Sequence, residues 1–451
     1  METSQILAVI IFGIMFAIII WEKYPRYVPA LVGAVFMIGI VFFAVMQSPD
    51  AMWKVLNLGQ LADWHFWVPG QSHVESFGVN WQTIIFIGGM MVMVAGMERV
   101  GFFRWICLFT ARLVGCRIIP LLMSFMLISG FLSMFIDSIT VLLFLSIVTI
   151  ELARLLKFDP VPVIVAEIFA ANVGGAATMS GDPPNIIIGT AFGYNFFDFL
   201  LNTGIIAWIC MAVSLAYFYL IFRRSLKQET TPSEIMKVVP LPGSAITDRR
   251  LFGIVTAIFF FVVILIVTHA QTGLSVAIIG VIAAVITLAV DLRHVKEVFQ
   301  GVNWQTLLFF IGLCICVGGL EVTGVLEMIA RFIGDASGGE ITLAIPLILW
   351  ISAIASAIVD NIPFAATMVP VIKELAVVGG MSLPTLAWTL ALGTDMGGNA
   401  TPIGASANVV GTAVAQKEGY PISWGRYLKY ALPPMLLVVG LSNLYLIIRY
   451  A

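Results

Sequence analysis

Charged residues are scarce in this 451-residue chain: they make up 11% of it, whereas hydrophobic residues make up 60%. A soluble domain has about 25% charged residues, so the composition excludes one. Apolar runs of about 17 to 23 residues recur along the chain, close to the roughly 20 residues that a helix needs to cross a bilayer. Strands of a membrane β-barrel would alternate apolar and polar residues instead. The sequence predicts an all-α, multi-pass integral membrane protein, in the plasma (inner) membrane if the source is prokaryotic.

Cysteine and histidine are also few, with five and four residues. The cysteines lie within or beside apolar runs, where core packing explains them better than metal binding. They are Cys107, Cys116, Cys210, Cys314 and Cys316. The histidines, which all fall in expected loops, are His65, His73, His269 and His294. We therefore expect no metal centre and no cofactor apart from sodium ions that could occupy cation sites.

The sequence lacks the motifs of an ATP-driven pump and of an enzyme. The pattern G-x-x-x-x-G-K-[ST] does not occur, so ATP could drive this chain only through a separate subunit. No nucleophile with a nearby base is visible, which argues against an enzyme. We expect no nucleic-acid partner.

An internal repeat organises the chain. The tetrapeptide NWQT occurs at residues 80–83 and again 223 positions later, at residues 303–306. The same shift relates Asp137 to Asp360. Matches at one constant shift over so much of the chain do not arise by chance, so we expect two structural repeats. The predicted units are residues 1–222, a linker at residues 223–250, and residues 251–451.

Each repeat is predicted to contain two early spans, a third after the tetrapeptide, a hairpin bent at its aspartate, a broken span and a closing span. If each hairpin enters and leaves by one face, the repeat crosses five times, and an odd count makes the repeats inverted. The expected fold has about ten transmembrane helices plus two re-entrant hairpins and two broken helices. The first apolar run, residues 6–21, lacks a basic flank and a cleavage site, so we expect it to be retained as a span.

Basic residues predict the orientation. They gather in the 223–250 linker and in loops that the topology puts on the same side, which is therefore expected to be cytoplasmic. The loop residues are Lys23, Arg26, Arg112, Arg117, Arg154, Lys157, Arg293, Lys296, Arg426 and Lys429. The loop at residues 47–80, which has one lysine and no arginine, is expected outside together with both termini.

The breaks are glycine-rich stretches inside apolar runs: NVGGAATMSGDPPN at residues 172–185 and DMGGNATPIGASAN at residues 395–408. In hydrocarbon an unwound backbone is tolerated only where it is buried in protein or lines a watery cavity. Glycines permit the unwinding, the prolines of GDPPN prevent the helix from continuing, and Asn185 could cap a new half-helix. Helix amino ends would suit an anion, and freed carbonyls would suit a cation. Packing kinks are the alternative, but symmetric pairs of breaks favour binding sites.

Polar side chains of the ion-binding type accompany the breaks. An ionised Asp at mid-membrane depth costs roughly 3 kcal/mol even on a lenient scale, so it is a functional candidate. The candidate cation-binding residues are Asp137, Ser138, Asn172, Thr178, Asp360, Asn361, Asp395, Asn399 and Thr401. The candidate substrate-binding residues are Gly181, Asp182, Asn185, Gly404, Ser406 and Asn408. Glu167, about a turn before the first break, is either a proton carrier or a carboxylate that reaches cytoplasmic water.

Three segments carry a family resemblance: FLSMFIDSITVLLF, AANVGGAATMSGDPPNIIIGT and GGNATPIGASANVVGTAVAQKEGY. They resemble signature segments of the ion transporter superfamily, nearest to the P-protein group of ArsB-like carriers, over about residues 75–450. That superfamily also holds arsenite efflux carriers, NhaD-type sodium/proton antiporters, and dicarboxylate and citrate carriers. The resemblance implies a scaffold and a transport domain with an elevator-type motion, often in a homodimer.

The resemblance also implies a grouping of site residues. Asp137, Ser138, Asn172 and Thr178 would form one cation site, and Asp360, Asn361, Asp395 and Thr401 its mirror. Ser138 stands where P-protein relatives more often have Asn, and the two aspartates stand where dicarboxylate carriers have Ser-Asn-Thr tips.

The leading functional hypothesis is a secondary transporter that couples sodium or protons to the movement of a small anion or neutral oxyacid across the lipid bilayer. The alternatives are a sodium/proton antiporter, an arsenite or antimonite efflux carrier, and an anion channel.

Overall fold

The computed structural model describes residues 2–21, 23–67, 78–223 and 239–451, and these residues form helices and loops without any strand. The predicted all-α class is confirmed. Parts of the predicted 47–80 loop and of the 223–250 linker, together with His73, lie outside the described residues.

The helices of the first half follow the predicted order. They are α1 (Thr3–Trp21), α2 (Tyr27–Phe36) with a π-helical continuation η1 (Met37–Val45), the short α3 (Pro49–Leu56), α4 (Gly59–Ala62) and α5 (Trp64–Trp67), then α6 (Trp81–Arg99), α7 (Phe102–Leu113), α8 (Ile118–Leu132), α9 (Ser138–Leu156), α10 (Val161–Gly175), α11 (Pro183–Phe192), and α12 (Phe196–Phe199), which continues through η2 (Leu200–Gly204) into α13 (Ile205–Phe222).

The second half begins after the turn η3 (Pro242–Ala245). Its helices are α15 (Arg249–Thr272), α16 (Val276–Val290), η4 (Leu292–His294), α17 (Val295–Gly301), α18 (Trp304–Val322), α19 (Val325–Ser337), α20 (Ile341–Val359), α21 (Asn361–Val378), α22 (Leu383–Gly397), η5 (Gly398–Ala400), α23 (Ser406–Lys417) and α24 (Trp424–Tyr450). The expectation that every histidine lies in a loop is wrong for His269, because α15 continues to Thr272. His65 falls in the short α5 and His294 in η4.

Nine helices in the described residues are long and apolar enough to cross a membrane, and the pair α16–α17, bent by 95°, could supply a tenth. The predicted number is about ten. The members differ, because length and composition select α9 and α20, which are arms of the predicted hairpins, and leave out the broken helices α10–α11 and α22–α23.

Two helix crossings recur in the two halves. Where α6 packs against α16, a Cβ on Gly89 would lie 2.0 Å from the carbonyl oxygen of Gly280. Where α18 packs against α2, a Cβ on Gly312, which is 223 positions after Gly89, would lie 2.7 Å from the backbone of Ala30. Small residues that let backbones touch are typical of helix packing in membranes. The recurrence supports the internal repeat, while its inversion stays a prediction.

The hairpins pack against the broken helices in the same repeated manner. A Cβ on Gly174 of α10 would lie 2.1 Å from the carbonyl oxygen of Gly130 in α8. A Cβ on the equivalent Gly397 of α22 would lie 2.2 Å from the Cα of Ala353 in α20. These approaches hold each hairpin directly against the helix that breaks beside it.

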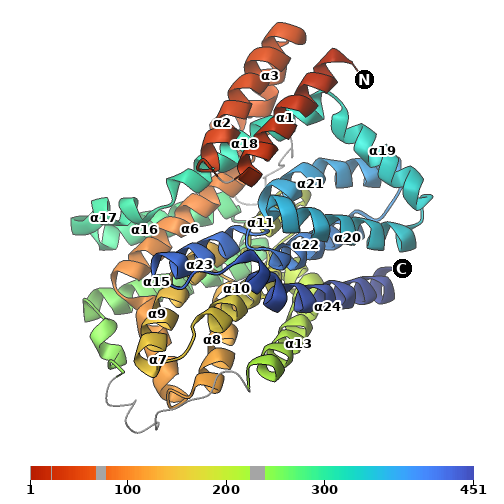
Figure 1. The fold of residues 1–451 in the computed structure, drawn as a ribbon. Helices are drawn as coiled ribbons and strands as arrows, with labels where there is room; N and C mark the ends of the chain where they lie inside the picture. Colours follow the sequence, from red (N-terminus) through yellow and green to blue (C-terminus); the bar gives the residue numbers. More distant parts are fainter. Residues whose placement is uncertain (1, 22, 68–77, 224–238) are drawn as a thin grey trace.

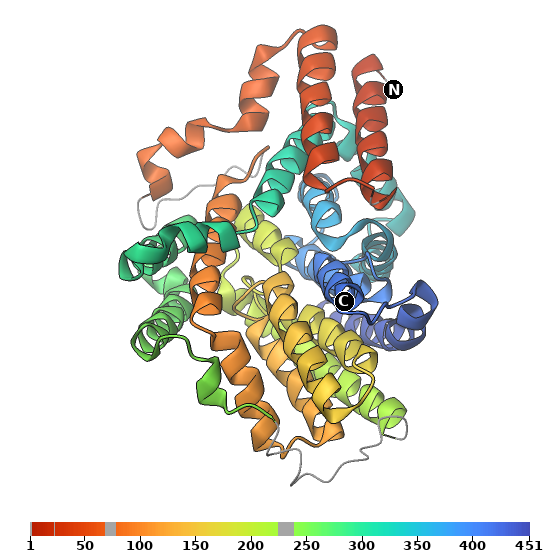
Figure 2. The same ribbon diagram turned by 60° about the vertical axis from the view of Figure 1, so that its left-hand side comes forward.

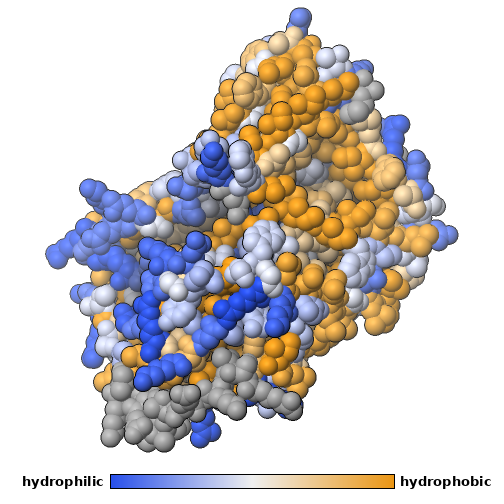
Figure 3. Space-filling view, in the orientation of Figure 1, coloured by the Kyte–Doolittle hydropathy of each residue, from blue (hydrophilic) through white to orange (hydrophobic). Residues whose placement is uncertain are grey.

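The breaks lie at the centre of the molecule. In Figure 1, α10, α11, α22 and α23 occupy the middle, α8 and α9 lie below them, and α20 and α21 lie above and to the right. Every residue of α10 is buried, and so is α22 from Thr385 to Gly397. Figure 2 shows α1 to α3 projecting from one end of the molecule. In Figure 3 hydrophobic residues cover α1 and α2, whereas hydrophilic residues gather around α17 and over the lower front.

Candidate functional site

Each hairpin turns at an aspartate that caps its second helix. Asp137 begins α9, and its carboxylate accepts hydrogen bonds from the backbone N–H of Thr140 (3.0 Å) and from the Thr140 hydroxyl (2.8 Å). Asp360 begins α21, and its Oδ1 accepts from the backbone N–H of Ile362 at 3.1 Å. Capping satisfies amide donors that the helix itself leaves unpaired.

The two caps differ because the sequence differs three residues later. Pro363 stands 223 positions after Thr140, and proline offers neither a backbone N–H nor a hydroxyl. Both carboxylate oxygens of Asp137 therefore accept hydrogen bonds from its own helix. Only Oδ1 of Asp360 does so, and its Oδ2 contacts residues of other segments. Asp360 also has a backbone φ of 95°, a region that costs a non-glycine residue of order 1–3 kcal/mol and persists mainly where a site requires it.

Both broken helices fold back on themselves in the same way. A Cβ on Gly181 would lie 2.4 Å from the carbonyl oxygen of Gly175, and a Cβ on Gly404 would lie 2.5 Å from that of Gly398. Only glycine fits at these two positions, which sequence analysis assigned to the substrate site.

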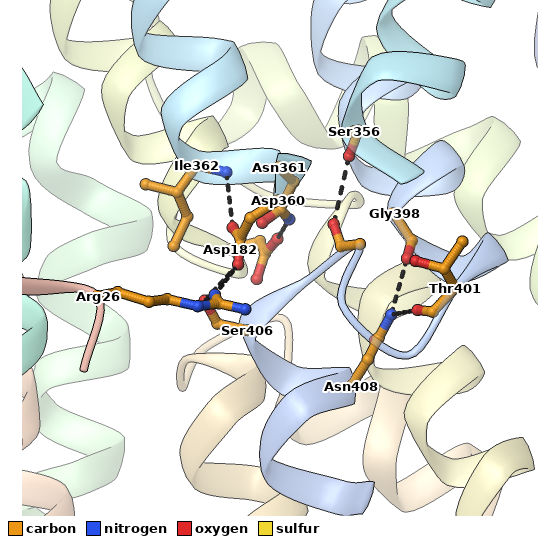
Figure 4. A network of polar contacts seen from close by, with 11 residues as sticks. Arg26, Asp182, Ser356, Asp360, Asn361, Ile362, Gly398, Thr401, Ser406 and Asn408 are labelled. Carbon is orange, nitrogen blue, oxygen red and sulfur yellow. Dashed lines mark hydrogen bonds and ion pairs between the residues drawn. The ribbon is translucent and has the colours of Figure 1, made fainter. Parts of the chain in front are cut away.

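Asn185 and Asn408 hold the two breaks in place. The Asn185 side-chain amide donates to the carbonyl oxygens of Gly175 and Thr178, each at 3.2 Å. The Asn408 amide donates to the equivalent carbonyls of Gly398 (2.7 Å) and Thr401 (2.8 Å), as Figure 4 shows. The expectation that Asn185 caps α11 is wrong, because α11 begins at Pro183 after Asp182 and proline suits the first helical position.

One threonine in each break bonds to the hairpin of the same half. The Thr178 hydroxyl donates to the carbonyl oxygen of Met134 at 2.5 Å. The Thr401 hydroxyl makes the same bond to Ala357, 223 positions later. Thr178 and Thr401, predicted as cation ligands, thus donate to backbone carbonyls in this structure, and only their remaining lone pairs could contact an ion.

Asp182 joins the two hairpins. Its Oδ1 accepts from the hydroxyl of Ser138, at the tip of the first hairpin, at 2.6 Å. Its Oδ2 accepts from the side-chain amide of Asn361, at the tip of the second hairpin, at 2.5 Å (Figure 4). The Asp182 side chain is 2% exposed. Ala405 stands at the equivalent position of the second break, so this carboxylate has no mirror image.

Arg26 enters the site from the loop between α1 and α2. Its guanidinium forms an ion pair with Oδ2 of Asp360 and donates to the Ser406 hydroxyl at 3.1 Å. The same hydroxyl donates to Oδ2 of Asp360 at 2.9 Å, and Figure 4 shows these groups meeting beside Asp182. The sequence indicates Arg26 only as a charge in a loop, because one basic residue between two apolar runs gives no signal of its partner.

A second polar group links the two broken helices. The side-chain amide of Asn172 donates to the side-chain oxygens of Asn399 (3.0 Å) and Asn408 (2.8 Å). Asp395, the repeat equivalent of Asn172, is fully buried, and neither of its carboxylate oxygens has a hydrogen-bond partner among the described residues. A buried carboxylate is expensive unless it is neutralised or hydrogen-bonded, and Asp182, Asn185 and Asn361 lie close enough to Asp395 to interact with it.

The candidate residues therefore meet both within the halves and across them. Asp182 accepts from Ser138 of its own half and from Asn361 of the second half. Asn172 of the first half donates to Asn399 and Asn408 of the second. Asp182 also interacts electrostatically with Asp360, Asp137 and Asp395. The roles assigned to these residues stay predictions. Among the described residues, no group of three His, Cys, Asp or Glu side chains could hold a metal ion, so sodium ligands would include hydroxyls, amides and carbonyls.

Two cavities flank this region and differ in size. One of about 480 Å³ is lined by Lys23 and Arg26, by the start of α18 including Asn303 and Thr306, and by Ser406. The other, of about 40 Å³, lies at the start of α6, beside Asn80 and Thr83. The first has the volume of a small-ligand site, whereas the second has room for only a few water molecules.

Thr190 of α11 contacts two residues that line the small cavity. Its hydroxyl accepts from the Asn80 side-chain amide at 2.8 Å and lies 3.0 Å from the Thr83 hydroxyl. At the large cavity, Asn303 and Thr306 face α23, where Ala413 stands at the position equivalent to Thr190. The hydroxyl that joins α11 to the start of α6 thus has no counterpart between α23 and the start of α18.

Comparison with known proteins identifies the family. The model of the family described as "CitMHS: Citrate transporter" matches residues 16–393, which include both hairpin tips and the first break. The "46 kDa membrane protein" of Mycobacterium leprae (strain TN) is 31% identical, with 99% of each chain covered. An "Uncharacterized transporter" of Mycobacterium tuberculosis (strain ATCC 25618 / H37Rv) is 32% identical, again with 99% of each chain covered. The P protein of Homo sapiens is 27% identical over all of this chain and 60% of its own length.

Solved structures agree on the fold. The YdaH transporter of Alcanivorax borkumensis superposes with a TM-score of 0.59 at 12% identity, covering 99% of this chain and 98% of its own. MtrF of Neisseria gonorrhoeae, described as illuminating a class of antimetabolite efflux pumps, superposes with a TM-score of 0.54 at 10% identity, covering 100% and 95%. At these identities the likeness concerns the fold alone. The chain belongs to the citrate transporter family CitMHS, and it is a multi-pass secondary transporter of the ion transporter type and not an enzyme.

Proposed function

We propose that the protein couples the transport of a small anion to sodium ions or protons, which bind where Asp182 meets the two hairpin tips. The observation that carries this proposal is the contact of one buried carboxylate with both Ser138 and Asn361. A hard cation at this point would find carboxylate, hydroxyl and amide oxygens. Its binding would also fix the distance between the hairpins, so that cation occupancy controls the shape of the site.

The charges of the site support a cation requirement. Asp182, Asp360 and Asp395 are each at most 2% exposed, and Arg26 is paired with Asp360. Two buried carboxylates then remain without an ion-pair partner among the described residues, and repulsion between like charges in a poorly hydrated interior is strong. Sodium ions or protons would remove that repulsion.

Two observations favour a carried anion over the alternatives. The large cavity is lined by two basic side chains and by no carboxylate among its described residues, a lining that a bare sodium/proton antiporter does not need. The small cavity beside Asn80 and Thr83 has room for only a few water molecules, whereas the large one could hold an anion, a difference that favours a carrier over an open channel. The citrate named in the family description is one such anion. An elevator-type motion of the hairpins and broken helices against the remaining helices is part of this proposal, as is assembly into a homodimer.

The test is the substitution Asp182→Asn, assayed by anion uptake into proteoliposomes. The amide keeps the shape of the side chain but removes its charge, so we expect the sodium or proton dependence of uptake to fall by at least about tenfold, the equivalent of one charge-assisted contact. The matched control is Asp159→Asn, which neutralises an exposed carboxylate paired with Arg426. An Asp182→Asn protein with unchanged cation dependence would refute the assignment.

A further inference from the structure

The ion pair between Arg26 and Asp360 lies at the second hairpin tip, next to Asn361, which contacts Asp182 at the proposed cation site. Asp360 is 1% exposed and Arg26 is 20% exposed on the side of the large cavity. The guanidinium therefore contacts the buried carboxylate and also lines the large cavity. Figure 4 shows Arg26 extending into the site from a separate segment of chain.

We propose that Arg26 is an exchangeable counter-ion: in the empty carrier it neutralises Asp360, and an oxyanion that enters the large cavity draws it away, leaving Asp360 to a sodium ion or proton. This inference rests on the proposed function and deepens it. It names the residue that binds the anion and the contact through which anion and cation binding are linked.

The cavity has the chemistry of an anion site. Besides Arg26 it is lined by Lys23, the side chains of Asn303 and Thr306, and the Ser406 hydroxyl that already bonds Arg26. Its volume of about 480 Å³ suits a carboxylate or phosphate of small-metabolite size. A guanidinium has five N–H donors in a planar fork and binds carboxylates and phosphates in a bidentate manner.

The sequence leaves Asp360 dependent on an outside partner. Its repeat equivalent, Asp137, uses both oxygens on Thr140, but Pro363 removes those donors from the second tip. The buried Oδ2 is instead shared by Arg26 and Ser406. The positive φ of Asp360 shows that this tip keeps a costly conformation while the contact holds.

Exchange of Arg26 makes the two ligands cooperate. Removing Arg26 alone would leave a buried carboxylate unpaired, which is strongly unfavourable, so the anion binds well only when a cation takes over at Asp360. By linkage, the anion must raise the affinity for the cation by the same factor. Without anion, Arg26 competes with the cation for Asp360.

The experiment measures binding to the purified full-length protein by calorimetry, with citrate, succinate, inorganic phosphate and sulfate as probe anions. Each probe is titrated with and without sodium at fixed pH, and over a pH series in choline. Sodium binding is titrated separately in the absence of any probe. For the wild type we expect at least one probe to bind at least about tenfold more tightly with the coupling cation present.

Arg26→Gln should change three quantities together. Probe affinity should fall by at least about tenfold, because a charge-assisted bidentate contact is lost. Cation affinity without probe should rise, because the tethered competitor is gone. The linkage between the two ligands should disappear. A residue that merely braced the fold would not raise cation affinity, so this sign separates the two roles.

Three further variants distinguish the role of Arg26 from a general effect of positive charge in the cavity. Arg26→Lys keeps the charge without the fork and should fall between wild type and Arg26→Gln. Lys23→Gln removes a cavity charge that stacks on Trp21, so it should weaken the probe but preserve the linkage. In an Asp360→Asn background, Arg26→Gln should no longer change cation affinity.

The outcomes separate this inference from the function on which it rests. A wild type with cation-linked probe binding and an Arg26→Gln protein with the same linkage, or with lower cation affinity, would overturn the inference and leave the proposed function standing. A wild type that binds no probe in any condition would refute both.

Discussion

At the scale of single residues, Glu167 is the buried acid that the site does not use. It is fully buried in α10, its Oε1 accepts from the Thr149 hydroxyl at 2.5 Å, and its Oε2 has no partner among the described residues. The expectation that it could reach cytoplasmic water is wrong, because α10 is covered on all sides. Of the two sequence-based alternatives, the proton carrier is the one compatible with this position, and the structure adds a third, a packed neutral acid.

We predict that Glu167→Gln leaves transport and its pH profile nearly unchanged. An ionised carboxylate buried without a cation is costly, so a neutral amide of the same shape should fit, with a loss of stability below about 1.5 kcal/mol from the altered Thr149 bond. Uptake into proteoliposomes across a pH series, with thermal unfolding of the purified protein, checks this. A flattened pH profile at normal stability would instead make Glu167 the proton carrier.

At the scale of elements, the turns and helix breaks that depend on residues close together in the sequence were predicted correctly. The hairpin turns at Asp137 and Asp360 and the breaks at the glycines follow from local chemistry, and the structure has each of them. The same residue types recur 223 positions later, so each turn or break predicted in one half was supported by its equivalent in the other half.

Contacts between distant segments could not be predicted in this way. Asp182 and Asn361 are 179 positions apart, and their meeting depends on how α11 and α21 are placed in space. The partner of Arg26 and the continuation of α15 through His269 were missed for related reasons. A lone arginine gives no signal of its partner, and polar residues at the end of a long apolar run do not by themselves end a helix.

The contacts of Thr190 beside the small cavity give a prediction about α6 and α11. Thr190→Val keeps the side-chain shape but removes the hydroxyl that holds Asn80 and Thr83. Each such bond contributes about 0.5–1.5 kcal/mol net, so the loss should raise the open population at this end up to about tenfold. Cys314 lines the small cavity and can report this opening.

The measurement is the rate at which a membrane-impermeant thiol reagent labels Cys314 in a protein whose other four cysteines are replaced. Thr412→Val is the matched control, because the Thr412 hydroxyl bonds only to carbonyls of its own helix, at Asn408 and Val409. Equal labelling of the Thr190→Val and Thr412→Val proteins would show that Thr190 does not hold this end closed.

At the scale of the whole molecule, the two halves have the same arrangement of hairpins and broken helices but supply different polar side chains to the site. The first half supplies Asp182, and the second supplies Asp360 with its dependence on Arg26. Their equivalents, Ala405 and Asp137, lack these roles. An exact repeat would have given two similar sites, whereas the substitutions at these few positions leave one carboxylate cluster between the hairpins and one open cavity beside it.

Cation-coupled anion transport, the central claim, is tested most directly by flux into proteoliposomes under imposed sodium, proton and voltage gradients. We predict that labelled citrate, or another of the four probe anions, accumulates above equilibrium when an inward sodium or proton gradient is imposed, and that accumulation stops when the gradient is collapsed. Ion exchange that proceeds at full rate with no anion present, together with no gradient-driven uptake of any probe, would contradict the account and favour the sodium/proton antiporter.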